Sequence, residues 1–318
     1  MRLRSGKSIK GYRKPVACII SVFNKRCIAI ISTLGFILEK EASVKLEKHM
    51  RFLLVIICAS LIPASGIGAE AAFENFRRVD FGIQIQDYKW KEYADNGNQL
   101  LAETGNFYGL TCDLESTKNI VGWRSGMNLF FGEVDYSGRT WTDIPVTTDV
   151  LYVGTKLYVD AVPGFRFDSG LWLKAFAGLG GEFWLRDLDD TKTADGDSVN
   201  GAREWWGCLY GRMGLGVEYP VAEEVVIFAE GGVKLPIYAR NEANFFVSGS
   251  PSAGLEPEMD FSGFGNVGLR WKQWGAKVSY DALRFDRSDV VSSGMVSLYQ
   301  PESQADVYSI ETFWSKTF

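Results

Sequence analysis

Histidine is almost absent from this sequence of 318 residues. Its single histidine is His49, which lies in a segment that we expect to be missing from the mature protein. A chain without histidine cannot use Ser-His-Asp or Cys-His catalysis, and it cannot bind metals through imidazole. The sequence therefore excludes most nucleophilic hydrolases and histidine-ligated metal sites.

Long apolar runs and cysteines are also scarce. The mean hydropathy is -0.05, whereas a bundle of transmembrane helices would need several apolar runs of about 20 residues. Two of the five cysteines, Cys112 and Cys208, lie after residue 71. We expect them on opposite faces of separate strands, and a disulfide between such positions is disfavoured.

Glycine and aromatic residues are abundant instead. The chain has 34 Gly, 21 Phe, 13 Tyr and 10 Trp, but only 9 Pro. High glycine together with high aromatic content is typical of β-barrels and β-sandwiches rather than helical proteins. The composition therefore favours an all-β fold.

The first 71 residues differ in character from the rest. Residues 1–49 carry 11 Lys and Arg against 3 Asp and Glu, and Met50-Arg51 then precedes an apolar run over 52–63. Small residues follow, with an A-x-A site at 69–71. This order is typical of a secretory signal peptide. We expect 1–49 to be an upstream extension, 50–71 a signal peptide and 72–318 the mature domain. The alternative is one long targeting segment that starts at Met1.

Removal of residues 1–71 changes the charge balance of the chain. The mature part keeps 22 basic and 35 acidic residues, a net charge of about -13 by this count. A nucleic-acid-binding protein would need the opposite sign. We therefore expect no nucleic-acid partner.

Alternation of apolar and polar residues is the dominant pattern of the mature part. On the clearest segment, Leu173, Ala175, Ala177 and Leu179 share one face, and Phe176 lies on the other. Such segments are longer than the five or six residues usual in soluble sheets, and they suit tilted strands that cross a bilayer. Ten strands are predicted, over 79–92, 104–115, 120–136, 148–167, 171–187, 204–219, 225–240, 258–271, 274–286 and 305–318.

The connections between these segments alternate in length. The long ones cover 93–103, 137–147, 188–203, 241–257 and 287–304, and short turns separate the other pairs. Short periplasmic turns and long outer loops are typical of outer-membrane barrels. An even number of strands then puts both termini on the periplasmic side.

Tryptophans gather at the predicted strand ends. We expect two aromatic belts at the membrane interfaces, with Trp123, Trp172, Trp271, Trp274 and Trp314 at the short-turn end and Trp90, Trp184, Trp205 and Trp206 at the long-loop end. The last segment alternates up to a terminal aromatic residue, Phe318. Together with the signal peptide and the alternating strands, these features resemble small outer-membrane β-barrels of Gram-negative bacteria.

The resemblance implies a location and partners, but no chemistry. It implies an outer-membrane protein in contact with lipid and lipopolysaccharide, and recognition of Phe318 by the outer-membrane assembly machinery. Omptin proteases also have ten strands, but they depend on an aspartate–histidine pair, and the mature chain has no histidine. We therefore expect no enzymatic activity and no cofactor, and the sequence identifies no extracellular ligand.

Charged residues on the non-lipid face are expected to line the barrel. The anions are Glu182, Glu204, Glu218, Glu230, Asp260 and Asp281, and the cations are Arg124, Lys156, Lys174, Arg186, Arg212, Lys234, Arg240, Arg270 and Lys277. They should pair, because an unpaired buried charge costs several kcal/mol. About eight strands are filled by side chains while 16 leave a channel, so a ten-stranded lumen should be nearly plugged. Inward glycines at 178, 180, 214, 216 and 232 should leave local space.

The third long loop carries the only metal candidates, and they are weak. Asp187, Asp189, Asp190, Asp195 and Asp197 could offer oxygen ligands to Ca²⁺, but they lack the register of an EF-hand. A solvated acidic loop is the favoured interpretation. The sequence thus predicts a structural or surface-interaction barrel. The alternatives are a narrow solute channel and, least favoured, an Asp/Glu-dependent hydrolase at the outer rim.

Overall fold

The computed structural model describes residues 76–118, 121–140, 143–193, 195–245, 252–293 and 296–318. They belong to the second of two compact units of the chain, Glu70–Phe318. The predicted extension (1–49) and signal peptide (50–71) lie outside the described residues. Within the described residues, no helix is long and apolar enough to cross a membrane.

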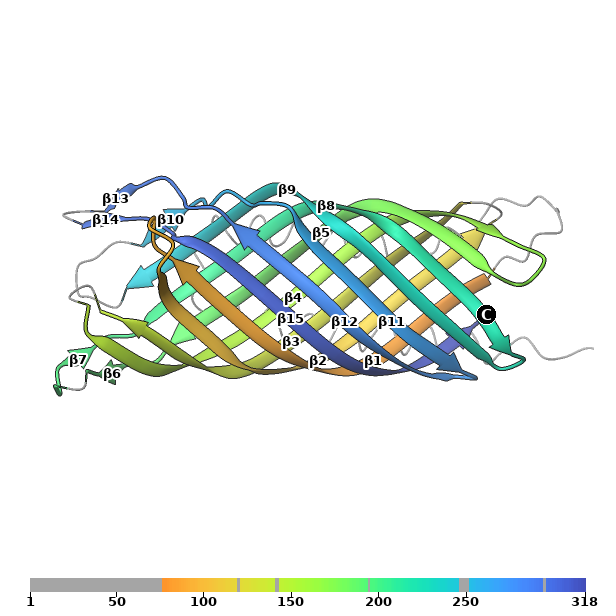
Figure 1. The fold of residues 1–318 in the computed structure, drawn as a ribbon, viewed down its shortest axis with the longest axis horizontal. Helices are drawn as coiled ribbons and strands as arrows, with labels where there is room; N and C mark the ends of the chain where they lie inside the picture. The colour runs from red at the N-terminus through yellow and green to blue at the C-terminus, as the bar shows by residue number, and fades with distance from the viewer. Residues whose placement is uncertain (1–75, 119–120, 141–142, 194, 246–251, 294–295) are drawn as a thin grey trace, which may run out of the picture. The chain divides into compact units, whose positions relative to one another are not determined.

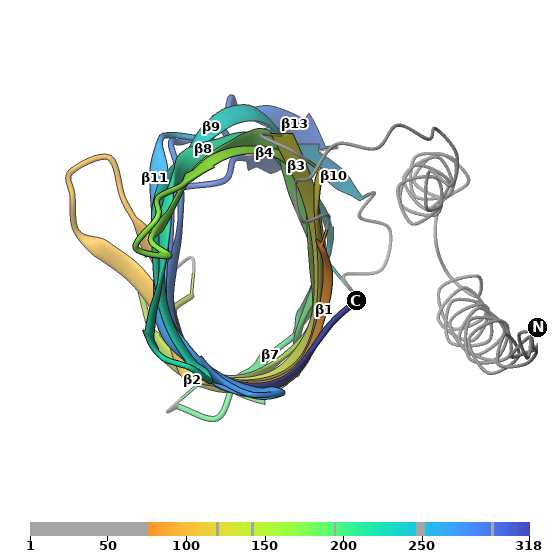
Figure 2. The same cartoon turned by 90° about the vertical axis from the view of Figure 1, so that its right-hand side faces the viewer.

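Ten long antiparallel strands form a closed barrel, as the sequence predicted (Figures 1 and 2). Each long strand pairs with its neighbours in the chain, and β1 (Phe76–Tyr93) closes the ring by pairing with β15 (Glu302–Thr317). The others are β2 (Gln99–Lys118), β3 (Val121–Arg139), β4 (Pro145–Arg166), β5 (Trp172–Leu188), β8 (Ala202–Ala222), β9 (Val225–Phe245), β11 (Ser262–Trp271) and β12 (Trp274–Phe285).

Short strands lie within the long connections. The pair β6 (Thr191–Lys192) and β7 (Ser198–Val199) forms a small hairpin in the third loop. The pair β13 (Val291–Ser293) and β14 (Val296–Leu298) forms another in the fifth. The strand β10 (Ala253–Leu255) extends the barrel wall beside the outer part of β9. These additions place ordered backbone at the long-loop end.

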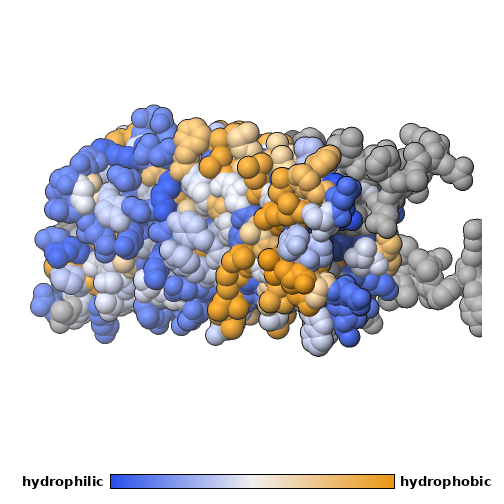
Figure 3. Space-filling model, turned by 45° about the vertical axis from the view of Figure 1, so that its right-hand side comes forward, coloured by the Kyte–Doolittle hydropathy of each residue, from blue (hydrophilic) through white to orange (hydrophobic). Residues whose placement is uncertain are grey.

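The barrel wall is longer than a membrane crossing requires. Strands β2, β8 and β9 have 20, 21 and 21 residues, whereas about 9–11 cross the hydrocarbon. Apolar side chains form a belt toward the short-turn end, and the opposite end is hydrophilic (Figure 3). On β1, Ile83 and Ile85 are 63% and 56% exposed, and Asp87 and Lys89 follow on the same face. The outer part of the wall therefore stands beyond the membrane.

The inside–outside assignment of β5 is confirmed. Leu173 and Leu179 are exposed on the lipid face, while Phe176 is buried in the lumen. The same alternation holds along β8, where Leu215 faces outward and Tyr210 inward. Period-2 patterning was therefore sufficient to orient these two strands.

The prediction for the outer part of β9 was wrong. Arg240 was predicted in the lumen, and strict alternation along the strand would put Tyr238 there as well and Ala239 on the lipid face. Ala239 is instead buried and Tyr238 is exposed. The register with β8 shifts at Pro236, which leaves Ile237 without a partner on β8. Proline has no N–H to donate to the ladder, so the strand bulges there and the following residues change face.

The prediction of a second aromatic belt was also wrong. At the short-turn end, Trp271 and Trp274 face outward as expected, although Trp172 is buried inside the barrel. At the long-loop end, Trp90, Trp184 and Trp206 are all buried, whereas Trp205 is half-buried. The wall at this end extends past the hydrocarbon, so the indole rings of Trp90, Trp184 and Trp206 have no lipid interface to occupy and fill the lumen instead.

Candidate functional site

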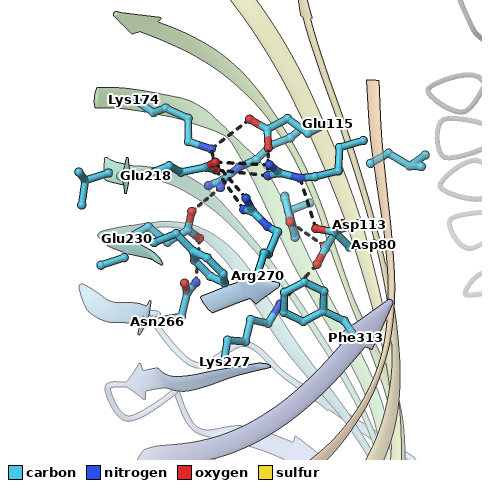
Figure 4. A pocket seen from close by; sticks show the side chains of 18 residues that line it. Asp80, Asp113, Glu115, Lys174, Glu218, Glu230, Asn266, Arg270, Lys277 and Phe313 are labelled. Carbon is cyan, nitrogen blue, oxygen red and sulfur yellow. Dashed lines mark hydrogen bonds and ion pairs between the residues drawn. The ribbon is translucent and has the colours of Figure 1, made fainter. Parts of the chain in front are cut away.

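The lumen is the candidate site, and side chains from all ten long strands fill it in layers. At the short-turn end lies what we call the basal cluster: Arg78, Glu115, Lys174, Glu218 and Arg270 (Figure 4). The Lys174 ammonium lies 2.5 Å from a Glu218 oxygen and 3.1 Å from Glu115. Arg270 donates to both Glu218 oxygens at 3.0 and 3.1 Å. Arg78 pairs with Glu115 and Glu218, so two carboxylates share three cations.

A cavity of about 80 Å³ lies beside the basal cluster. Its lining includes Arg124, Glu230, Asn266 and Lys277 in addition to the aromatic ring of Phe313. One water needs about 10–15 Å³ of such volume and two to four polar partners. The cavity is therefore large and polar enough for several water molecules.

Paired charges continue toward the middle of the barrel. Lys156 lies 2.8 Å from Asp281 and 3.2 Å from Glu182. Lys234 lies 2.7 Å from Glu182 and also pairs with Asp281, and the Tyr210 hydroxyl donates to Glu182 at 3.1 Å. The expected pairing of inward charges is thus confirmed for these residues.

Aromatic rings occupy the space beside three of the five inward glycines, whereas Gly216 lines the 80 Å³ cavity, as expected of a glycine that leaves local space. A Cβ added at Gly180, Gly214 or Gly232 would overlap the ring of Tyr210, Phe176 or Phe264, respectively. The guanidinium of Arg124 lies 4.2 Å from the Phe176 ring centroid, and that of Arg212 lies 4.7 Å from the Phe264 ring centroid. These glycines make room for cation–aromatic contacts, so they do not open a path.

An aromatic layer crosses the lumen nearer the long-loop end. The rings of Trp184 and Trp206 stack with centroids 5.3 Å apart and planes 5° apart. Trp90 and Phe285 contact Trp206 with centroid distances of 5.4 and 5.5 Å. Tyr88, Phe107, Phe130 and Tyr152 pack beneath them, where the cavity is only about 20 Å³. This layer lies between the 80 Å³ cavity and the outer mouth.

Carboxylates hold the aromatic layer from its outer side. Arg186 pairs with Glu103 and, at 2.7 Å, with Glu204. The indole N–H of Trp206 donates to Glu204 at 2.8 Å. The indole N–H of Trp90 donates to Glu92 at 3.0 Å. Indole N–H groups buried without a partner would be costly, so these bonds fix the rings across the lumen.

Two of the predicted inward charges lie elsewhere. Asp260 is exposed and precedes β11. Arg240 lies beyond the β9 bulge, where its partly exposed side chain pairs with Glu242 and Glu256. The sequence reading also missed lumenal acids, although the alternation of their own strands could have located them: Asp80, Glu92, Glu103, Asp113, Glu115, Asp160 and Glu311.

The calcium candidates of the third loop are spread out. Asp187 pairs with Arg203 at 2.7 Å, and an Asp190 oxygen accepts the backbone N–H of Gly201 at 2.7 Å. Asp189, Asp195 and Asp197 are exposed. In the described part of the chain, no three His, Cys, Asp or Glu side chains gather to hold a metal ion. Neither Cys112 nor Cys208, both described, forms a disulfide.

Comparison with solved structures supports the fold. No protein-family model and no curated protein matches the chain. Among solved structures it is similar to the outer membrane protease OmpT of Escherichia coli, with a TM-score of 0.57 and 10% identity, over 79% of this chain and 98% of that chain. The autotransporter NalP translocator domain from Neisseria meningitidis has 14% identity and a TM-score of 0.38, over 85% of this chain and 96% of that one.

At 10% identity the likeness to OmpT shows a common fold alone. The structure is a closed antiparallel barrel of ten long strands. This is the fold of bacterial outer-membrane β-barrels, and the apolar belt supports the predicted outer-membrane location.

Proposed function

We propose that the protein is a non-enzymatic outer-membrane barrel that acts through its outer loops and does not conduct solutes. The observation that carries this proposal is the aromatic layer of Trp90, Trp184, Trp206 and Phe285, whose side chains are at most 6% exposed. Charged pairs fill the lumen below it. A wall that extends beyond the membrane supports a role for the loops at its end.

Conductance across planar bilayers tests this proposal. The purified protein should show no openings, or only small and rare ones. Trp206→Ala should increase the conductance because it removes the ring that contacts Trp90, Trp184 and Phe285. Trp205→Ala is the matched control, since the neighbouring side chain lies on the other face of β8. Large, stable steps from the unmodified protein would refute the proposal.

A narrow channel is the second candidate, and the basal cavity favours it. The polar cavity of about 80 Å³ on the short-turn side could form the lower part of a water-filled path through the barrel. The aromatic layer would then have to move to complete the path. A steady small conductance in the unmodified protein, in place of no openings or rare ones, would support this candidate over the first.

An enzymatic role has the least support. OmpT is a protease by name, but the residues described here include no histidine. The paired carboxylates Glu103 and Glu204 are both bound to Arg186, and they lie buried beneath the outer mouth. We therefore propose that an assay of peptide cleavage with intact barrels will show no turnover.

A further inference from the structure

The lipid-facing apolar band is short on the wall that β15, β1 and β2 form, which we call the short wall. Apart from one threonine, the outward side chains are apolar or aromatic over residues 79–85 of β1, 108–114 of β2 and 308–314 of β15. Outward charges end the run of β1 on both sides, at Arg77 and Asp87. Only a short stretch of each of these strands therefore suits hydrocarbon.

The apolar band is much taller on the opposite side of the ring, where β4, β5 and β8 form what we call the tall wall. Apart from one threonine, the outward side chains are apolar, aromatic or glycine over residues 151–165 of β4, 173–185 of β5 and 205–219 of β8. Toward the long loops, the runs of β4 and β8 end at the outward charges Asp149 and Arg203. Most of the length of these strands thus suits hydrocarbon.

The two walls differ in the length of the band, so a tilt of the whole barrel does not explain the difference. At about 3.3 Å per residue and a strand tilt of about 40°, the run of β1 spans about 15 Å of barrel height and the run of β8 about 35 Å. The apolar band of such barrels is ordinarily about 25 Å tall. A tilt would raise the band on one wall and lower it on the other, but it would leave both heights unchanged. A flat bilayer therefore matches neither wall.

Outward aromatic side chains mark both ends of the band on each wall. On β15 they are Tyr308 and Trp314. On β8 they are Trp205 and Tyr219, which lie much further apart along the strand. Trp205 is the outward one among the four tryptophans predicted for the long-loop end. Because such rings favour the membrane–water interface, their positions indicate that lipid covers the full height of the band on both walls.

One height of the barrel carries opposite chemistry on the two walls. Val153 is as far from the short-turn end of β4, at Arg166, as Lys89 is from the short-turn end of β1, at Phe76. Val153 is 43% exposed. The Lys89 side chain is 46% exposed and lies 3.0 Å from Asp87. An apolar side chain thus faces outward on the tall wall where the short wall presents an ion pair.

We propose that the barrel deforms the outer membrane around itself, so that the bilayer is thin beside the short wall and thick beside the tall wall. Local thinning or thickening relieves a mismatch at modest cost, whereas large apolar side chains left in water oppose folding. Acyl chains then cover Val153 and Leu151 on β4, and headgroups descend to Asp87 on β1. The inference goes beyond the proposed role of the loops, because it concerns the lipid-facing wall and the bilayer that this wall fits.

Spin labels at matched heights on the two walls test the proposal. Lys89→Cys and Val153→Cys are made in a Cys112→Ala background and labelled on the folded barrel, in which Cys208 is 1% exposed. In vesicles of dioleoylphosphatidylcholine, the relative access of oxygen and of a nickel chelate gives the depth of each label. Val153 is one outward position inside the end of its apolar run, and Lys89 is two beyond the end of its own. Since each outward position adds about 5 Å of height, the Val153 label should lie in the hydrocarbon, about 15 Å deeper than the Lys89 label.

Labels within the apolar run of each wall are the matched controls. Ile83→Cys on β1 and Val159→Cys on β4 replace outward residues that are 63% and 40% exposed, and both labels should lie in hydrocarbon whether or not the bilayer is deformed. Leu151→Cys supplies a second tall-wall label if Val153→Cys fails to fold. Equal depths of the Lys89 and Val153 labels would show a bilayer of uniform thickness and overturn the proposal. A Val153 label shielded from both oxygen and the chelate would overturn it too, since protein would then cover this wall. Neither result bears on conductance, so failure here is distinguishable from failure of the proposed function.

Discussion

Two adjacent tryptophans of β8 show that the position of a residue in the strand decides whether its side chain faces the lumen or the outside of the barrel. Trp206 is 3% exposed and makes ring contacts with Trp90, Trp184 and Phe285. Trp205 precedes it on the opposite face. An indole ring, with its apolar body and polar N–H, is favourable both in a lumen and at a lipid interface. Residue type alone therefore does not predict where it lies. Position in the strand decides it.

Substitution by arginine at two outward positions should depend on depth. Ala177 lies in the apolar belt of β5 and Ser137 lies near the outer end of β3, and both are exposed. Ala177→Arg should reduce the free energy of folding into lipid vesicles by about 2–4 kcal/mol, and Ser137→Arg by about 0–1 kcal/mol. Urea-titrated refolding measures both. Equal losses would mean that the belt is not where the exposed apolar residues put it.

The lumenal neighbour of Ala177 should not tolerate an arginine either. The ring of Phe176 packs beside the guanidinium of Arg124 and fills the space over Gly214. Another cation there would have neither volume nor a partner. We therefore expect Phe176→Arg to destabilise the barrel in the same refolding titration.

The long strands were predictable because their alternation is a local property of the chain. Over residues 173–185 of β5 and 205–219 of β8 every second residue is apolar or glycine, and the pairing between these two strands follows that pattern without a register shift. Along β9 the pattern also reads as continuous, but Pro236 introduces a bulge that one-dimensional alternation does not reveal. Pairing partners were beyond reach as well, because Arg78 and Glu218 are 140 residues apart and the sequence does not show register between strands.

The bulge in β9 predicts opposite outcomes at neighbouring residues. Ala239 is 3% exposed and Tyr238 is 45% exposed. Ala239→Arg should destabilise the barrel by about 1–3 kcal/mol through overpacking, whereas Tyr238→Arg should change the stability little, since surface substitutions stay within about 0.5 kcal/mol. Refolding titrations of the two variants measure the difference. The reverse order would indicate an unbulged strand.

The predicted processing of the chain concerns residues 1–71, which lie outside the described residues. The apolar run after Met50 and the small residues at 69–71 should direct export and cleavage. N-terminal sequencing of protein purified from outer membranes should therefore begin at Glu70 or Ala72. Recovery of residues 1–49 on the mature protein would show that the extension is retained.

For the whole molecule, the height of the barrel separates the outer loops from the part that is embedded in the membrane. A strand of 21 residues such as β8 is about 70 Å long, and a tilt of about 40° gives a height of about 50 Å. The apolar band of such barrels is about 25 Å tall. The part of the barrel wall outside the apolar band is thus roughly as tall as the part inside it, and it separates the outer loops from the membrane. Mutations that alter the loops need not disturb insertion, so the surface can diversify under selection while the lipid-facing half stays constant.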